Sequence, residues 1–309
     1  MKKATMKDIA RLANVSVATV SYVLNNVQKQ TIPEATKVNI LQIAKELNYV
    51  PNLAARSLVL RKTGLVGILI NRTADTPYWK QQNHSTFISG LEAKLTEAGY
   101  HTLLVSLNPD NPYLDVIRER KLDAVFLIDV KEEQFYRISA NFTEGVPLIL
   151  IDSLISDPLF NQVYFNYPGA LDQARSALPL PACLVMESFN NAAFMDAIIS
   201  GASLPGEQIY VVKGTQDLSD LCTFLKQNQG KHMIVTNEFL GKIIENSYTG
   251  PVTVLCTCDL PQILDNTTAT VQFADDRSRT SFELMETLMQ NHGGHAVHQA
   301  NQFWVDVLK

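Results

Sequence analysis

The chain has 309 residues, a length that suggests about two domains with sizeable cores. Hydrophobic residues make up 46% of the chain and charged residues 18%, a composition that excludes a fully disordered protein. The net charge of −5 argues, at face value, against a nucleic-acid partner.

The charge is unevenly distributed along the chain. Residues 1–62 carry ten lysines and arginines against three acidic residues, which gives a net charge of +7. The remaining residues therefore carry a net charge of −12. A basic head on an acidic body indicates a nucleic-acid-binding module joined to a second module.

Membrane and secreted classes are not favoured. The longest apolar stretches, at 65–70 and 146–151, fall far short of the roughly 18–20 residues that span a bilayer. No apolar segment of a signal peptide follows Met1-Lys2-Lys3. We therefore expect a cytoplasmic protein with four reduced, scattered cysteines.

The head is predicted to hold three short helices. The first begins after Thr5, which forms a capping box with Asp8, and the second begins after Ser16. The third is expected to start around Pro33, with Thr31 and Glu34 at capping-box spacing. Each helix has an apolar face at helical spacing: Met6, Ile9, Ala10 and Ala13; Val20, Val23 and Leu24; Ile40, Ile43, Ala44 and Leu47. Two helices joined by a tight turn and braced by a third form a helix-turn-helix.

The second helix carries a further stripe on its opposite face, made of Ala18, Ser21, Tyr22 and Asn25. Hydroxyl, aromatic and amide groups of this kind contact base edges and phosphates in a major groove. The alternative is an ordinary solvated face. The net charge of +7 favours the DNA-reading interpretation.

Six short segments of the head and of the residues after it carry a family resemblance: DIA at 8–10, ANVS at 13–16, TVS at 19–21, LN at 24–25, LNYVPN at 47–52 and AARSL at 54–58. With them the chain closely resembles the headpiece of the LacI/GalR (lactose-repressor/galactose-repressor) family of bacterial transcription regulators. The resemblance implies that Val17, Ala18 and Tyr22 read the major groove. Small apolar groups at the first two of these positions favour contacts with thymine methyl groups.

The resemblance also implies a hinge helix at 51–62. Asn52 is placed to cap this segment, which is too short to form a stable helix alone; a plain linker is the alternative. In the resembled family the hinge folds when two subunits pair over the minor groove. Leu58 then corresponds to the wedge between base steps, Ala55 packs beside it, and Arg56 contacts phosphate or the hinge. We expect Leu58→Ala to weaken operator binding without affecting folding.

The residues expected to contact DNA thus extend from the head into the hinge. They are Thr5, Ser16, Val17, Ala18, Thr19, Ser21, Tyr22, Asn25, Asn52, Ala55, Arg56 and Leu58.

The body is predicted to alternate strands with helices, which is typical of parallel sheets covered by helices. Strands are expected at 65–70, 101–106, 124–127, 148–151, 163–165, 183–186, 208–212, 232–235 and 252–256. Helices are expected at 89–98, 192–200, 218–227 and 238–246.

The predicted fold class is therefore an all-α helix-turn-helix headpiece plus an α/β body. The resemblance implies that the body consists of two parallel-sheet subdomains similar to a type I periplasmic binding protein, with a ligand cleft between them. It divides the chain into a DNA-binding headpiece at 1–50, a hinge at 51–62 and an effector-binding and dimerisation domain at 63–309. The implied effector contacts are Tyr78, Trp79, Asp152, Asn190, Asn237 and Asp259, groups that suit a polyhydroxylated ligand.

Several positions of the body depart from the family pattern. The family's Asp-Asn-x-x-Gly corresponds to residues 165–169, where the sequence is FNYPG. The family's pocket arginine aligns with Asn190, and its Asn-Asp pair with Asn237-Glu238. An arginine in the cleft is a rigid donor of two hydrogen bonds, and its loss puts a typical sugar site in doubt. Three alternatives stay open: the body binds an unusual effector, a phosphoprotein co-regulator, or no small molecule at all.

Signals for catalysis and metal binding are weak. His292, His295 and His298 are three residues apart, but the glycines between them disfavour one helix, so we expect a solvated turn and no metal. No nucleophile–base arrangement or phosphate-binding glycine loop is present in the sequence, and neither an enzyme nor a cofactor is expected.

The function expected from the sequence is that of a homodimeric regulator, most simply a repressor. It binds a pseudo-palindromic double-stranded operator, and a sugar-like small molecule or a protein co-regulator changes its affinity. A soluble small-molecule-binding protein is the alternative from a different class.

Overall fold

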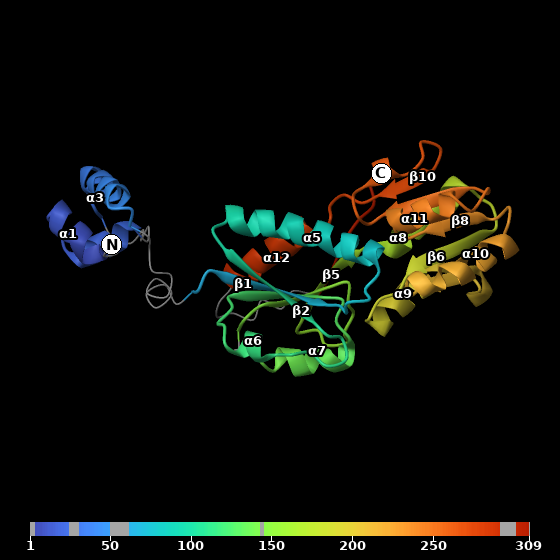
Figure 1. Ribbon diagram of the computed structural model, residues 1–309, viewed down its shortest axis with the longest axis horizontal. Helices are drawn as coiled ribbons and strands as arrows, with labels where there is room; N and C mark the ends of the chain where they lie inside the picture. The colour runs from blue at the N-terminus through green and yellow to red at the C-terminus, as the bar shows by residue number, and fades with distance from the viewer. Residues whose placement is uncertain (1–3, 25–30, 50–61, 143–144, 291–300, 309) are drawn as a thin grey trace. The chain divides into compact units, whose positions relative to one another are not determined.

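The computed structural model describes residues 4–24, 31–49, 62–142, 145–290 and 301–308 (Figure 1). The chain divides into two compact units, a head at Met1–Thr63 and a body at Gly64–Lys309. None of the helices in the described ranges is long and apolar enough to cross a membrane. The hinge residues 51–61 and the three spaced histidines, His292, His295 and His298, lie outside these ranges.

The head contains the three predicted helices. They are α1 (Met6–Ala13), α2 (Val17–Leu24) and α3 (Glu34–Glu46). Their buried core consists of Ile9, Ala10, Val20, Ile40 and Ala44, all drawn from the apolar faces predicted for the three helices. The remaining members of those faces pack partly buried around this core.

Local capping explains where the first two helices begin. The hydroxyl of Thr5 accepts a hydrogen bond from the Asp8 amide and the Asp8 carboxylate accepts one from the Thr5 amide, so the predicted capping box is confirmed. Asn14 ends α1 in a left-handed conformation with φ 53°, which turns the chain towards α2. The Ser16 hydroxyl then accepts a hydrogen bond from the Thr19 amide at 3.0 Å.

The predicted capping box of the third helix is wrong. Helix α3 begins at Glu34 and its N-cap is Pro33, which has no side-chain group to offer. The Pro33 carbonyl accepts the first helical hydrogen bonds from Thr36 and Lys37, and Glu34 pairs with Lys37 instead of reaching back to Thr31.

The first lobe of the body is a parallel sheet covered on both faces (Figure 1). Its strands run in the order β11-β5-β4-β3-β1-β2. Helices α5 and α12 pack on one face and α6 and α7 on the other. The bounds are β1 (Leu65–Asn71), β2 (His101–Leu107), β3 (Ala124–Ile128), β4 (Leu148–Ile151), β5 (Asn161–Phe165), β11 (Gln302–Val305), α5 (Tyr78–Glu97), α6 (Asp115–Arg118), α7 (Glu132–Ser139) and α12 (Ser278–Gln290).

The second lobe repeats this plan with five parallel strands in the order β10-β9-β8-β6-β7. Helices α8 and α9 share one apolar core, and α10 and α11 lie against another. The bounds are β6 (Ala182–Glu187), β7 (Ile209–Val212), β8 (His232–Val235), β9 (Val252–Cys256), β10 (Ala269–Gln272), α8 (Tyr167–Ala177), α9 (Ala192–Ala202), α10 (Leu218–Gln227) and α11 (Glu238–Glu245), with short 3₁₀ turns at Gly206–Gln208, Thr215–Asp217 and Pro261–Ile263.

The predicted fold class is confirmed, and all nine predicted strands are present with ends shifted by at most two residues. The sequence reading missed β10 and β11, the helices α6, α7, α8 and α12, and the first half of α5, which begins at Tyr78 and not at Ser89. The missed half of α5 is polar, yet Lys80, Asn83 and His84 are buried there. A buried polar face leaves no apolar stripe in the sequence.

Each sheet has a topological switch point, where successive strands change from one side of the first strand to the other. The switch lies between β1 and β3 in the first sheet and between β6 and β8 in the second. Ligands of open α/β sheets bind beside the carboxyl ends of strands at such switch points. In this chain those ends are Asn71 and Asp129 in the first lobe, and Glu187 and the residues following Val235 in the second.

Candidate functional site

The outer face of α2 is the exposed surface of the head that the sequence predicted to read DNA. The Val17 side chain is 42% exposed and that of Tyr22 is 36% exposed, and Ala18 between them is also exposed. The opposite side of α2 is held by the buried Val20, so the helix is anchored by one face and presents the other. Thr5 and Ser16 stand at the starts of α1 and α2, where their hydroxyls already act as caps.

The remaining predicted DNA contacts divide into two groups. Thr19 and Ser21 are half-buried on α2, and the Thr19 hydroxyl bonds to that of Ser16 at 2.9 Å. The other predicted contacts lie outside the described residues: Asn25, Asn52, Ala55, Arg56 and Leu58.

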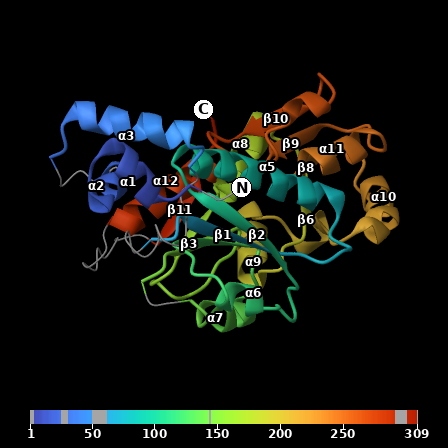
Figure 2. The same ribbon diagram turned by 60° about the vertical axis from the view of Figure 1, so that its left-hand side comes forward.

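The second candidate site is the interlobe cleft, defined here as the buried polar cluster where the strand ends of the two lobes meet. Its members are Asn71, Lys80, Asn83, His84, Asp129, Asp152, Glu187, Asn237 and Arg277, each at most 7% exposed. Helix α5 supplies three of them, and its N-terminal half reaches the second lobe, where it contacts α11 (Figure 2). Buried charges at this density are costly unless they are paired.

One ion pair in the cleft joins Lys80 of α5 to Asp129 at the end of β3. The same ammonium donates to the Ser188 carbonyl of the second lobe at 2.8 Å. From the second lobe, Asn190 donates its backbone amide to Asp129 at 2.7 Å and its side-chain amide to the Asn71 carbonyl at 3.1 Å. Burial raises the pKa of Asp129, and the neighbouring Lys80 opposes that shift. This set of bonds ties the two lobes together.

A second ion pair joins Arg277 to Asp152, which follows β4. The other end of the guanidinium donates to Asn83 Oδ1 at 2.6 Å. Its carbon lies 4.3 Å from the centre of the Phe165 ring, a cation–π distance. Arg277 is 1% exposed and stands in the segment that passes from β10 to α12, between the lobes.

Glu187 is the third carboxylate of the cleft and has no ion-pair partner among the described residues. Its Oε1 accepts hydrogen bonds from Asn83 at 3.2 Å and Asn237 at 3.3 Å. Its Oε2 is buried and finds no hydrogen-bond partner within the described ranges. Burial raises the pKa of Glu187 to about 7, against the opposing charge of Lys80. The group therefore changes protonation near neutral pH.

The structure brings two of the six predicted effector residues, Asp152 and Asn237, into the cleft, and a third, Asn190, against its edge. Asp152 pairs with Arg277, Asn190 donates a hydrogen bond to Asp129, and Asn237 donates one to Glu187. Asn237 also caps α11, accepting from the Phe239 amide at 2.8 Å.

Trp79, predicted to contact an effector, lies in an apolar core and not in the cleft. Its side chain is 1% exposed and packs inside the apolar core of the second lobe, because the first turn of α5 inserts into that core. Tyr78 is 45% exposed and contacts the edges of Trp79 and Phe239.

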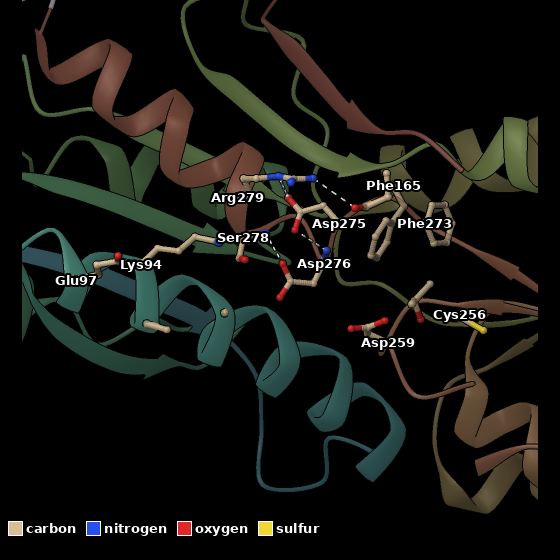
Figure 3. A pocket seen from close by; sticks show the side chains of 14 residues that line it. Lys94, Glu97, Phe165, Cys256, Asp259, Phe273, Asp275, Asp276, Ser278 and Arg279 are labelled. Atoms are coloured by element: carbon tan, nitrogen blue, oxygen red, sulfur yellow. Dashed lines mark hydrogen bonds and ion pairs between the residues drawn. The ribbon is translucent and has the colours of Figure 1, made fainter. Parts of the chain in front are cut away.

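Asp259, the last of the six, lies apart from the buried cluster. It is exposed and lines a pocket of about 490 Å³ between α5, the start of α12 and the loop after β9. Figure 3 shows that pocket, where Asp275 and Asp276 stand on the same side as Arg279 and Asp259 faces them from the other lobe.

The sequence analysis missed the arginine of the cleft. It noted that Asn190 stands where the resembled family has its pocket arginine, but not that Arg277 supplies a guanidinium from another segment. Lys80, Asn83 and Glu187 were missed as well, because a polar helix start and the last residue of a strand give no distinctive pattern.

A smaller cavity of about 240 Å³ opens beside Lys80 and Asn190, lined also by Arg72 and Lys213.

Comparison with known proteins agrees with the geometry of the head. Residues 5–52 match the family model described as bacterial regulatory proteins, lacI family. The head of this chain is thus similar to the DNA-binding head of that family. The match covers the three helices and the turn between α1 and α2.

Curated relatives resemble the chain over about half its length. The ribose operon repressor of Escherichia coli is 33% identical over 153 residues, which cover 48% of this chain and 44% of the relative. A probable transcriptional repressor of Bacillus subtilis, ExuR, is 32% identical over 168 residues, 52% of this chain and 47% of the relative. The matched part thus spans about half the length of these curated relatives.

Solved structures share the fold over most of the chain. The lac repressor dimer bound to operator and an anti-inducer aligns with a TM-score of 0.73 at 16% identity, covering 99% of this chain and 97% of that one. A LacI-family regulator from Enterococcus faecium with bound ribose aligns with a TM-score of 0.60 at 16% identity, covering 79% and 96%. At such identities the likeness concerns the fold.

Proposed function

We propose that this chain is a sequence-specific DNA-binding repressor of transcription. It binds a pseudo-palindromic operator as a homodimer in the cytoplasm, and it is not an enzyme. Residues 1–50 read the DNA, 51–62 form the hinge, and 63–309 bind the effector and pair the subunits. The observation that carries this proposal is the capped, basic helix-turn-helix whose second helix exposes Val17, Ala18 and Tyr22.

The named relatives support the same proposal. The E. coli and B. subtilis proteins are called repressors, and the lac repressor structure holds operator DNA. One recognition helix per half-site requires two copies of the chain for a two-fold symmetric operator.

The proposed effector is a small hydroxylated molecule such as a sugar or a sugar derivative. It would bind between the lobes, where the acceptor oxygens of Asp152 and Glu187 lie beside the amides of Asn83 and Asn237. Ribose, a sugar, appears in the names of two of the similar proteins: the E. coli ribose operon repressor and the E. faecium regulator with bound ribose.

A selection experiment tests the DNA-binding part. The full chain is mixed with random duplexes of about 30 base pairs, long enough for two half-sites one helical turn apart, and bound DNA is sequenced. We expect enrichment of one two-fold symmetric sequence, and Tyr22→Ala, which leaves the head core intact, should alter or abolish it. If the chain retained all duplexes equally, whatever their sequence, sequence-specific binding would be contradicted.

A further inference from the structure

The interlobe cleft contains the positively charged side chain of Arg277. Arg277 has a backbone φ of 73°, a left-handed conformation that large non-glycine residues rarely adopt. Its side chain is nevertheless fully buried between the lobes. A strained backbone at a buried arginine indicates that the contacts of the side chain outweigh the strain.

Those contacts form a complete guanidinium site. A carboxylate oxygen of Asp152 pairs with one nitrogen, and Asn83 Oδ1 accepts from another at 2.6 Å. The rings of Phe165 and Phe87 lie 4.3 Å and 5.6 Å from the guanidinium carbon. A carboxylate, an amide oxygen and aromatic faces are the groups that bind a free guanidinium ligand.

The charge of Asp152 is balanced by this one side chain. Lys80 pairs with Asp129 and its charge also acts on Glu187, which leaves Arg277 as the partner of Asp152. Removal of the guanidinium would leave Asp152 without an ion-pair partner among the described residues and would vacate the space between Phe165 and Asn83.

We propose that the interlobe cleft is a guanidinium-binding site that Arg277 occupies in place of a ligand, so that the lobes close on each other without an effector. This inference rests on the proposed function and specifies how the same cleft is regulated. An effector acts by taking over the hydrogen bonds that Arg277 makes with Asp152 and Asn83. Arg277 is then the residue that decides which molecules enter.

Chemical rescue of Arg277→Ala in the full chain tests the proposal. The melting temperature should fall by about 10 °C, because a buried carboxylate loses its partner. Methylguanidinium, at concentrations far below those that denature proteins, should restore at least half of the loss. Methylurea, which is similar in shape and uncharged, should restore none.

Arg279→Ala is the matched control. The Arg279 side chain is 57% exposed and pairs with Asp275 at 3.7 Å, so its loss should change the melting temperature little and leave it insensitive to methylguanidinium. Absence of rescue in Arg277→Ala, equal rescue by methylurea, or equal rescue of Arg279→Ala would overturn the site. If Arg277→Ala does not fold alone, it is refolded with methylguanidinium or with methylurea: recovery of folded protein only with methylguanidinium supports the site, and equal recovery with both, or with neither, overturns it.

Operator binding separates this inference from the proposed function. Affinity of Arg277→Ala for the selected operator should differ from wild type by about fivefold or more and return with methylguanidinium. Thermal rescue without any change in operator affinity would overturn the regulatory role. Failure of the wild-type chain to bind DNA would instead overturn the proposed function, because the thermal measurement needs no DNA.

Discussion

Tyr22 is a large aromatic residue of the head that belongs neither to its buried core nor to a helix cap. Its ring is on the exposed face of α2, opposite the buried Val20. We expect Tyr22→Ala to weaken binding to the selected operator by about 1–3 kcal/mol without changing the unfolding of the head, as loss of one base contact does. Filter binding of Tyr22→Ala and Tyr22→Phe separates the ring from the hydroxyl, and equal affinity of all three proteins would contradict the assignment.

Glu187 gives the body a dependence on pH. Because its pKa is raised to about 7 in the folded chain from an ordinary value of 4.5, the folded state binds the proton more tightly than the unfolded state does. This group therefore destabilises the fold progressively as pH rises from about 4.5 to about 7.

Glu187→Gln should remove that dependence. The amide can accept the bonds of Asn83 and Asn237 without acquiring charge. Between pH 5 and pH 8 the free energy of unfolding of wild type should fall by about 2 kcal/mol relative to the variant. Denaturant titrations at the two pH values measure this, and a constant difference would show that Glu187 does not titrate in this range.

At the scale of single elements, α2 depends on its cap. The Ser16 hydroxyl accepts from the Thr19 amide at the start of an eight-residue helix, which is too short to be stable alone. Ser16→Ala should destabilise the head by about 1 kcal/mol, as measured by its thermal unfolding. Ser16→Asp keeps an acceptor at this position and should restore stability; a melting temperature for it as low as that of Ser16→Ala would contradict the capping role.

Helix α5 joins the lobes through Trp79, whose ring is buried in the second lobe although most of the helix covers the first. Trp79→Ala should cost about 3–5 kcal/mol of unfolding free energy, because the core cannot fill the cavity. The chain's other tryptophan is the control. Trp304 is 52% exposed, so Trp304→Ala should cost at most about 1 kcal/mol, and equal losses would contradict the anchoring role of Trp79.

Elements with an uninterrupted apolar pattern were predictable from the sequence. Strands such as β3 and β4 are buried at every position and read as short hydrophobic runs. Strand β10 buries only Val271 and was missed, since one apolar residue makes no pattern. The cleft was predictable only in part, because the pairing of Arg277 with Asp152 spans 125 residues and depends on a left-handed backbone at Arg277.

At the scale of the whole molecule, the head and the body carry net charges of opposite sign. In the proposed function the basic residues 1–62 attract phosphates and the acidic remainder repels them, so we expect contact with DNA to be confined to the head. The exposed face of α2 at Val17, Ala18 and Tyr22 carries no charge. For the proposed operator we therefore expect affinity to come largely from the charged residues around this face, and sequence specificity from the helix.

The most direct test of the account is a salt titration of binding to the selected operator and to a scrambled duplex of equal length. For the operator, the logarithm of the binding constant should fall linearly with the logarithm of salt concentration, by about 0.9 for each phosphate contacted. Binding to the scrambled duplex should be weaker by a factor of about 1,000 or more at physiological salt. Equal affinity for both duplexes, or no binding at low salt, would contradict the claim that this chain is a sequence-specific DNA-binding regulator.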